Sequence, residues 1–396
     1  DPDDPLRSMA LYLPGHDANS PPFNPKFVQA LRPYGVLRYM DFMQTNGSEV
    51  QSWSDRPERE DFTYCKTDGI PLEYLIELAN ELGAYPWFCM PHMADDEYIR
   101  RFAGMVREQL DPRLICFVEY SNEVGNGSFE VHQYATRRGR ELGLATDADV
   151  EAFNQKYRYV EGGEMLDFVD VRGPASLNTM LRHRFQGLRT KQIAAIWNEV
   201  FGNEAHRVKV VITGSTQQLQ ISMDDPGVAE AVDFTAACSY WGFGLGRRIA
   251  ASGLSVPDLT KDDIFRMLRD DIEEKIGPKA QQQAAVARQF GKELLLYEGG
   301  QHLSAYGGGY GNLSQEDLRH FEALCLSCQR DPRMGELMQL DYDKWFDAGA
   351  KLYTVFSHIS PASGRYAWGM QEYLGQPLEE AVKLKALLEY METPKP

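Results

Sequence analysis

Several features typical of other protein classes are missing from this chain of 396 residues. There is no apolar run of about eighteen residues, the length that a membrane-spanning helix needs, so no membrane span is expected. Lys and Arg are scattered without a dominant basic run, and 58 acidic against 41 basic residues leave a formal charge of -17. Binding to a phosphate backbone relies on clustered cations, so the sequence does not favour nucleic acid as a partner.

Cysteine is scarce as well. The chain has six cysteines, too few for a disulfide scaffold, and three of them lie in apolar strand-like runs where a free thiol behaves as a small hydrophobe. Cys325 and Cys328 form a CxxC pair inside a helical pattern, with no second Cys/His pair nearby. A zinc or redox site is therefore not favoured, and whether the cysteines are free or bridged stays open.

What the chain does contain is an alternation of strand and helix patterns. It is 43% hydrophobic and 25% charged, which is typical of a packed globular core. Short apolar runs bounded by Gly, Pro or polar residues predict eight strands, at 9 to 15, 36 to 41, 85 to 91, 115 to 123, 207 to 215, 234 to 242, 294 to 300 and 352 to 358. Amphipathic helical stretches separate them, so the sequence predicts one (β/α)8 barrel over residues 1 to 396.

The alternative architecture is an open doubly wound sheet. It is disfavoured because the predicted first strand is followed by LPGHDANSPP and not by a Gly-rich phosphate turn. Two connections are oversized, at 42 to 70 and at 124 to 206, and connections that follow strands lie on the catalytic face of a barrel. We expect 124 to 206 to contain a helical insertion over the active-site face.

Polar side chains stand at the ends of the predicted strands, where catalytic groups emerge in barrels. Glu123 ends one apolar run (VEYSNE) and Glu298 ends another (LLLYEGG). Burying a carboxylate without a partner or a role costs free energy, and two carboxylates facing one cleft are what glycoside hydrolysis requires. The alternative is that either glutamate forms a structural ion pair with Arg38 or with a histidine.

The sequence motifs around these glutamates resemble those of clan A glycoside hydrolases, a group of barrel enzymes that includes cellulases, mannanases and many β-glycosidases. The resemblance lies in Ser121-Asn122-Glu123 and in Tyr297-Glu298. It implies a retaining β-glycosidase in which Glu123 is the general acid/base, Glu298 is the nucleophile, and Asn122 binds the 2-hydroxyl of the sugar.

Three further positions extend the resemblance. Arg38 resembles the arginine that supports the nucleophile, Tyr240 the tyrosine that hydrogen-bonds it, and His92 a histidine after the third strand. Two places depart from the pattern: the eighth strand ends in Phe-Ser-His (356 to 358) without the usual Trp, and Val-Gly-Asn (124 to 126) follows the acid/base. These departures put the layout of the sugar subsites in doubt.

Two other glutamates are set aside. Asn198-Glu199 repeats the Asn-Glu dipeptide, but it lies in a stretch with the apolar spacing of an amphipathic helix, so we reject it as catalytic. Glu119 precedes Glu123 by four residues on the same predicted strand, so both are expected on one face. Glu119 would then lie deeper in the barrel, with Arg38 as its structural partner.

Candidate sugar contacts come from aromatic and histidine side chains near the predicted catalytic face. Flat aromatic rings suit the C–H faces of sugar rings, and the candidates are Trp53, Trp241, Trp368 and His302. A neutral poly- or oligosaccharide is the expected substrate because the acidic surplus disfavours sulfated or uronic-acid-rich ones. No cofactor is expected, and the sugar, the linkage and the oligomeric state stay open.

Two competing functions remain. A metal-dependent barrel hydrolase would use His16, His92, His302 and His358, but no His-x-His or His-Glu-x-x-His spacing supports it. A non-catalytic carbohydrate-binding relative would keep the aromatic cleft, and the presence of both glutamates disfavours it.

The first residues, DPDDP, are typical of a linker, and the chain opens without Met or a signal peptide. A secreted or periplasmic location is therefore inferred from the function alone.

Overall fold

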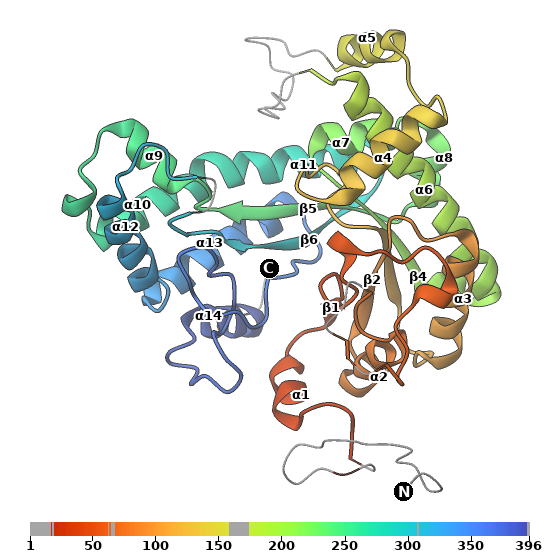
Figure 1. Ribbon diagram of the computed structural model, residues 1–396, viewed down its shortest axis with the longest axis horizontal. Coiled ribbons are helices and arrows are strands. Elements are labelled where there is room, and N and C mark those ends of the chain that lie inside the picture. Colours follow the sequence, from red (N-terminus) through yellow and green to blue (C-terminus); the bar gives the residue numbers. More distant parts are fainter. Residues whose placement is uncertain are drawn as a thin grey trace, which may run out of the picture.

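The computed structural model describes residues 17, 20 to 61, 63 to 64, 68 to 157, 174 to 306 and 309 to 393. Six parallel strands lie in one sheet in the order of the sequence: β1 (Val36–Arg38), β2 (Tyr85–Met90), β3 (Cys116–Tyr120), β4 (Val208–Thr213), β5 (Phe234–Trp241) and β6 (Glu293–Gln301). Helices cover the outside of the sheet (Figure 1). The expected α/β barrel is confirmed, with the sheet forming a nearly closed barrel.

The helices alternate with the strands, as the sequence predicts. Their bounds are α1 (Pro25–Leu31), α2 (Leu72–Leu82), α3 (Asp96–Gln109), α4 (Glu130–Glu141), α5 (Asp147–Lys156), α6 (Leu177–Phe201), α7 (Thr216–Ser222), α8 (Pro226–Ala231), α9 (Leu245–Ser252), α10 (Lys261–Asp271), α11 (Gly277–Gln289), α12 (Gln315–Cys328), α13 (Pro332–Ala348) and α14 (Val382–Glu392). Helices α4, α5 and α6 lie in the long connection from 124 to 206. That this connection covers the active-site face stays a prediction.

The two ends of the predicted barrel differ from the expectation of eight regular strands. The predicted first strand, 9 to 15, lies outside the described residues. The predicted eighth strand, 352 to 358, is not a regular strand: it runs beside β6 with a parallel bridge between Leu296 and Tyr353. Backbone hydrogen bonds from Leu296 to Leu352 and from Phe356 to Gly299 continue the contact. The two segments approach closely at Gly299, where an added Cβ would lie 2.4 Å from the Tyr353 hydroxyl.

A cavity of about 710 Å³ lies between β1 and the segment 351 to 359. Side chains of α1, α13 and α14 line its outer side, and Arg38, Tyr297 and Glu298 line its inner side. Strand β1 is the first strand of the sheet order, so its free edge faces this cavity. The barrel wall formed by the described residues is therefore open at this point.

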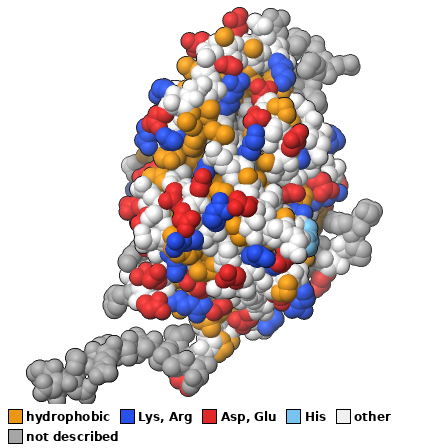
Figure 2. Space-filling view, turned by 90° about the vertical axis from the view of Figure 1, so that its right-hand side faces the viewer, with side chains coloured by type: hydrophobic (Ala, Val, Ile, Leu, Met, Phe, Trp, Pro, Cys, Tyr) orange, Lys and Arg blue, Asp and Glu red, His pale blue; other side chains and the backbone are white. Residues whose placement is uncertain are grey.

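Apolar side chains inside the barrel form their own small core, which includes Trp87, Phe117, Leu295 and Tyr297. Two larger clusters lie between the sheet and the surrounding helices, one around β1 to β4 and one around β5 and β6. On the face seen in Figure 2, acidic and basic side chains are interspersed and no field of Lys and Arg stands out. This agrees with the scattered charges of the sequence.

Candidate active site

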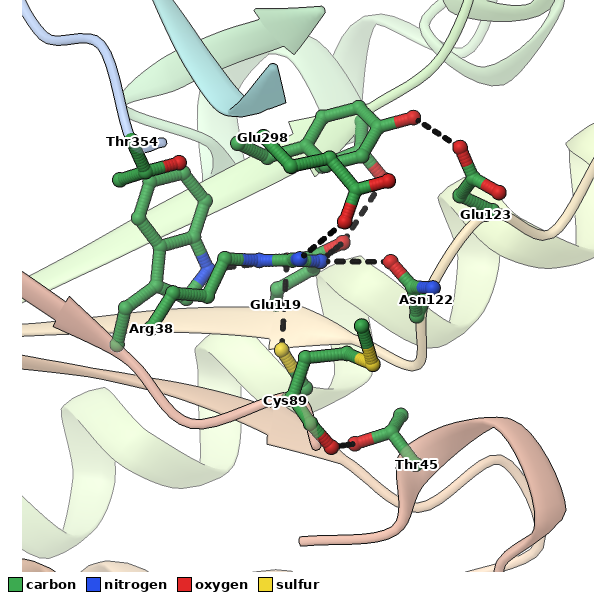
Figure 3. Close-up of polar contacts among 12 residues, drawn as sticks. Arg38, Thr45, Cys89, Glu119, Asn122, Glu123, Glu298 and Thr354 are labelled. Atoms are coloured by element: carbon green, nitrogen blue, oxygen red, sulfur yellow. Dashed lines mark hydrogen bonds and ion pairs between the residues drawn. The ribbon is translucent and has the colours of Figure 1, made fainter. Parts of the chain in front are cut away.

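Arg38, the last residue of β1, is the centre of a polar network at the carboxyl ends of the strands (Figure 3). Its Nη2 donates to Oε2 of Glu119 over 2.9 Å and to Oδ1 of Asn122 over 2.8 Å. Its Nη1 donates to Oε2 of Glu298 over 3.3 Å. One guanidinium therefore holds three side chains, two from β3 and its end and one from β6, which matches the fixed fork of donors that arginine offers.

Glu119 lies inside the barrel and is 1% exposed. Besides Arg38, it accepts hydrogen bonds from Nε1 of Trp87 over 2.9 Å and from Oγ1 of Thr213 over 3.0 Å. Burial raises the pKa of Glu119, and the charge of Arg38 opposes that shift. The expectation that Glu119 is the structural partner of Arg38 is confirmed.

The acid/base candidate sits just beyond β3, in a turn of unusual backbone geometry. Ser121 and Glu123 have φ values of 57° and 43°, in the left-handed region that non-glycine residues seldom adopt. The alternation of side chains between the two faces of β3 therefore stops at Tyr120, the last residue of that strand. Asn122, between the two, points to Arg38 and donates from Nδ2 to Oδ1 of Asn46 over 2.9 Å. Its Nδ2 carries a second hydrogen besides the one directed at Asn46, and Asn122 as a whole is 1% exposed.

A bulge in β6 brings two consecutive side chains to the barrel interior. The register with β5 pairs Ala237 with Leu296 and Cys238 with Glu298, so Tyr297 is the extra residue. Bulges of this kind redirect side chains next to functional sites. As a result, Tyr297 belongs to the core inside the barrel while Glu298 reaches Arg38.

Glu298 is 6% exposed and accepts a hydrogen bond from the phenol of Tyr240 as well as from Arg38. Burial and the negative charge of Glu123 raise the pKa of Glu298 to about 8, and Arg38 and Tyr240 oppose the shift. Near neutral pH the protonated form of Glu298 is therefore favoured. Two carboxyl groups in one site are able to divide general acid catalysis and nucleophilic attack between them, provided that the attacking group is ionised.

Glu123 is half-buried and is held at both carboxylate oxygens. The phenol of Tyr297 donates to Oε1 over 2.9 Å, and Nδ2 of Asn126 donates to Oε2 over 2.8 Å. In Figure 3 a dashed line joins Glu298 to the guanidinium of Arg38, whereas the dashed line from Glu123 leads to the hydroxyl of a ring. The two carboxylates thus have separate sets of partners.

An aromatic group continues outward from Tyr240. The ring of His302 makes edge contacts with Tyr240 at 5.7 Å, with Phe243 at 4.8 Å and with Trp368 at 5.2 Å between centroids. Trp368 is half-buried and lies 4.8 Å from Tyr366. Phe243 is 56% exposed and Tyr366 is 50% exposed. Two of the expected sugar contacts, His302 and Trp368, therefore lie together beside the partner of Glu298.

The other two tryptophans expected to contact sugar, Trp241 and Trp53, pack against other side chains of the protein. Trp241 is fully buried in the core around β5 and β6, which does not agree with a role as a sugar platform. The reason is alternation along β5: Tyr240 faces Glu298, so its neighbour Trp241 faces the helices. Trp53 packs on Tyr98 at 5.7 Å, with Arg56 over its ring.

His92 is 3% exposed, and its ring packs edge-on against Tyr134 of α4 at 5.1 Å. Burial and the positive charge of Arg137 lower the pKa of His92 to about 4, so its imidazole is neutral. Burial likewise lowers the pKa of His358 to about 4. His16 lies outside the described residues. Across the described parts of the chain, no three His, Cys, Asp or Glu side chains come together as possible metal ligands.

The stretch around Glu199 is helical, as the sequence predicts. Glu199 is on the long helix α6, where it pairs with Arg100 over 2.8 Å on the surface. Cys325 and Cys328 are buried on α12 and are not bridged, and neither are Cys89, Cys116 and Cys238. No helix in the described ranges combines the length and the apolar character needed to cross a membrane.

Sequence reasoning gave no role to four residues that the structure places at the site: Asn46, Asn126, Phe243 and Tyr297. Asn46 and Asn126 lie in the two oversized connections, so the length of those connections was the available signal. In the sequence, Tyr297 stands out only as the residue that precedes Glu298. Its contact with Glu123 depends on the left-handed turn after β3, which the residue pattern does not predict.

Comparison with known proteins gives distant structural likeness only. No family model matches the chain, and no curated protein matches it. An α-L-arabinofuranosidase from Thermotoga maritima, solved with arabinose, is 12% identical with a TM-score of 0.48, over 94% of this chain and 66% of that one. A β-galactosidase from Marinomonas ef1 is 14% identical with a TM-score of 0.43, over 92% of this chain and 56% of that one.

A family 5 glycoside hydrolase, a mannosidase from Rhizomucor miehei, is 10% identical with a TM-score of 0.41, over 92% of this chain and 87% of that one. The chain thus spans just under two-thirds of the arabinofuranosidase and little more than half of the β-galactosidase. Likeness at this level does not identify catalytic residues or a substrate.

Proposed function

We propose that this protein is a retaining glycoside hydrolase that cleaves a β-glycosidic bond in a poly- or oligosaccharide by double displacement. Glu298 is the nucleophile and Glu123 is the general acid/base. The observation that carries the proposal is the pair of glutamates at one end of the barrel with different partners. Arg38 and Tyr240 hold Glu298, while Tyr297 and Asn126 hold Glu123.

In the first step, an oxygen of Glu298 forms a bond to the anomeric carbon while the bond from that carbon to the leaving oxygen breaks. Glu123 gives its proton to the leaving oxygen. In the second step Glu123 takes a proton from water, whose oxygen attacks the anomeric carbon and releases Glu298. Because the pKa of Glu298 is raised to about 8, its carboxyl group must lose its proton before the attack of the first step.

Asn122 is the proposed ligand of the sugar 2-hydroxyl. Arg38 fixes the orientation of its amide, and Asn46 occupies only one hydrogen of its Nδ2. A hydrogen bond to the 2-hydroxyl strengthens as positive charge develops on the sugar ring. Arg38 contributes by keeping Asn122 and Glu298 in one fixed arrangement.

The substrate is proposed to be a neutral sugar chain. His302, Trp368, Phe243 and Tyr366 offer aromatic surface next to Tyr240, and such rings suit the C–H faces of pyranoses. A location outside the cytoplasm, secreted or periplasmic, is an inference from this activity and stays a prediction.

The test is hydrolysis of p-nitrophenyl β-glycosides of several neutral sugars and of a panel of neutral polysaccharides. We expect the unchanged protein to cleave at least one of them, with and without a metal chelator. Glu298→Gln and Glu123→Gln should each lower kcat/KM by about 1000-fold or more while the circular dichroism spectrum is kept. Azide should partly restore Glu123→Ala on an activated aryl glycoside, because azide needs no general base.

Glu199→Gln is the matched control, since Glu199 also follows an asparagine but lies on the surface of α6. We expect this variant to keep full activity. Full activity in Glu298→Gln or Glu123→Gln would overturn the proposal. Sugar binding without any turnover across the panel would point instead to a non-catalytic carbohydrate-binding protein.

A further inference from the structure

Two hydrogen bonds fix the orientation of the Glu123 carboxylate. Tyr297 donates to one of its oxygens over 2.9 Å and Asn126 donates to the other over 2.8 Å. The backbone N–H of Ser128 donates to Oδ1 of Asn126 over 3.0 Å, which fixes the amide with its Nδ2 toward Glu123. Both partners therefore act as donors to Glu123.

Tyr297 is itself held rigidly. It is 5% exposed, and its ring belongs to the core inside the barrel. The guanidinium of Arg38 lies over the ring, 4.9 Å from its centroid. Tyr297 points inward by alternation with Leu295, and the bulge in β6 brings the next residue, Glu298, to the same side. Through Tyr297, the position of Glu123 is tied to the same arginine that holds Glu298.

We infer that Tyr297 is a positioning residue for proton transfer by Glu123, with Asn126 as its counterpart on the other oxygen. The inference rests on the proposed function. When Glu123 gives its proton to the leaving oxygen, negative charge develops on its two carboxylate oxygens. Hydrogen bonds to a charged acceptor are stronger than bonds to a neutral one, so both donors stabilise this transition state more than the ground state.

This role makes a prediction that depends on the leaving group. A 2,4-dinitrophenolate leaves with little help from an acid, whereas a methoxyphenolate needs a proton as the bond breaks. We expect Tyr297→Phe to lower kcat/KM on the methoxyphenyl glycoside by about tenfold or more, and on the dinitrophenyl glycoside by less than about twofold. Asn126→Ala should show the same difference between the two substrates, and its loop position leaves the core intact.

Tyr353→Phe is the matched control. Its phenol also donates to a buried carboxylate, Asp341, over 2.6 Å, and its ring is close to Gly299 of β6. Loss of that bond should change both substrates by the same factor, whatever its effect on stability. Because Asn126 is away from the core, its variant keeps the test open if Tyr297→Phe does not fold.

Different outcomes would overturn the positioning role of Tyr297 and the proposed function. A wild-type protein that cleaves the dinitrophenyl glycoside, together with equal losses on both substrates in Tyr297→Phe and Asn126→Ala, would overturn the positioning role and leave the proposed function in place. A wild-type protein that cleaves neither glycoside, for every sugar in the panel, would overturn the proposed function and this inference with it. A selective loss on the poorer leaving group supports the inference.

Discussion

Arg38 donates to Glu298 over 3.3 Å from the same guanidinium that holds the buried carboxylate of Glu119 over 2.9 Å. The two glutamates come from different strands, β6 and β3. Glu119 also accepts hydrogen bonds from Trp87, Thr213 and the thiol of Cys89, so it is the fixed point of this arrangement. The position of the proposed nucleophile therefore depends on a carboxylate that never meets the substrate.

We expect Glu119→Gln to lower kcat/KM by about 100-fold, because Arg38 loses the partner that orients it toward Glu298. Breaking a buried ion pair also costs on the order of 3 kcal/mol, so the melting temperature should fall. Steady-state kinetics and thermal unfolding measure the two effects. Glu199→Gln, which breaks only the surface pair with Arg100, should change neither. Unchanged kcat/KM in Glu119→Gln would show that Glu119 does not orient Arg38 for catalysis.

The pH dependence of activity follows from the ionisation of the proposed nucleophile. Burial and the charge of Glu123 raise the pKa of Glu298 to about 8, so the protonated form of its carboxyl group is favoured below that pH. Attack on the anomeric carbon requires the ionised form. On an activated aryl glycoside, which needs little acid assistance, we expect kcat/KM to rise with pH up to about 8 and then to level off. A profile that falls between about pH 6 and about pH 8 would contradict the raised pKa of Glu298.

Stability should depend on Glu298 in the opposite sense to activity. Its carboxyl group has a folded-state pKa of about 8 against an ordinary pKa of 4.5 for a glutamate, so between these values the native state binds more protons than the unfolded state. Its contribution to the free energy of unfolding is therefore fully present below the lower value and is lost as the pH rises toward the upper one.

Glu298→Gln removes this loss, since a buried amide carries no charge. We expect its melting temperature to exceed that of the wild type by a few °C at about pH 8.5, with a smaller difference at about pH 5. Differential scanning calorimetry at the two pH values measures this. A difference that does not change with pH would mean that ionisation of Glu298 is not the cause.

Trp368 and Trp241 should respond differently to removal of the ring. Trp368 is half-buried beside His302, so Trp368→Ala should raise KM by about tenfold with little change in melting temperature. Trp241 is fully buried, so Trp241→Ala should cost about 3–5 kcal/mol of stability. Kinetics and thermal unfolding of both variants separate the two roles. A large loss of stability in Trp368→Ala would assign that ring to the core.

The sequence was sufficient to place the centre of the site, for a physical reason. Carboxyl ends of parallel strands meet at one end of a barrel, so Arg38, Glu298 and Tyr240 had to come together once the strands were recognised. Glu119 could be paired with Arg38 on the same ground. The predicted strand at 9 to 15 lies outside the described residues and stays a prediction.

Other parts depend on pairing and could not be read from the residues alone. The bulge at Tyr297 arises from the register between β5 and β6, and a single-strand pattern contains no information about register. The left-handed backbone at Ser121 and Glu123 is maintained by surrounding contacts. Trp241 is a different case: alternation with Tyr240 already indicated that only one of the two faces the barrel interior.

The most direct test of the central claim is a covalent trap for Glu298. A 2-deoxy-2-fluoro glycoside with a good leaving group, made from the sugar that the protein hydrolyses, slows the second step and lets the glycosyl ester accumulate. Intact-protein mass spectrometry should show the mass of one glycosyl group added, and peptide mapping should place it on Glu298. A label on another residue, or steady turnover to a product of inverted configuration with no label, would contradict the account.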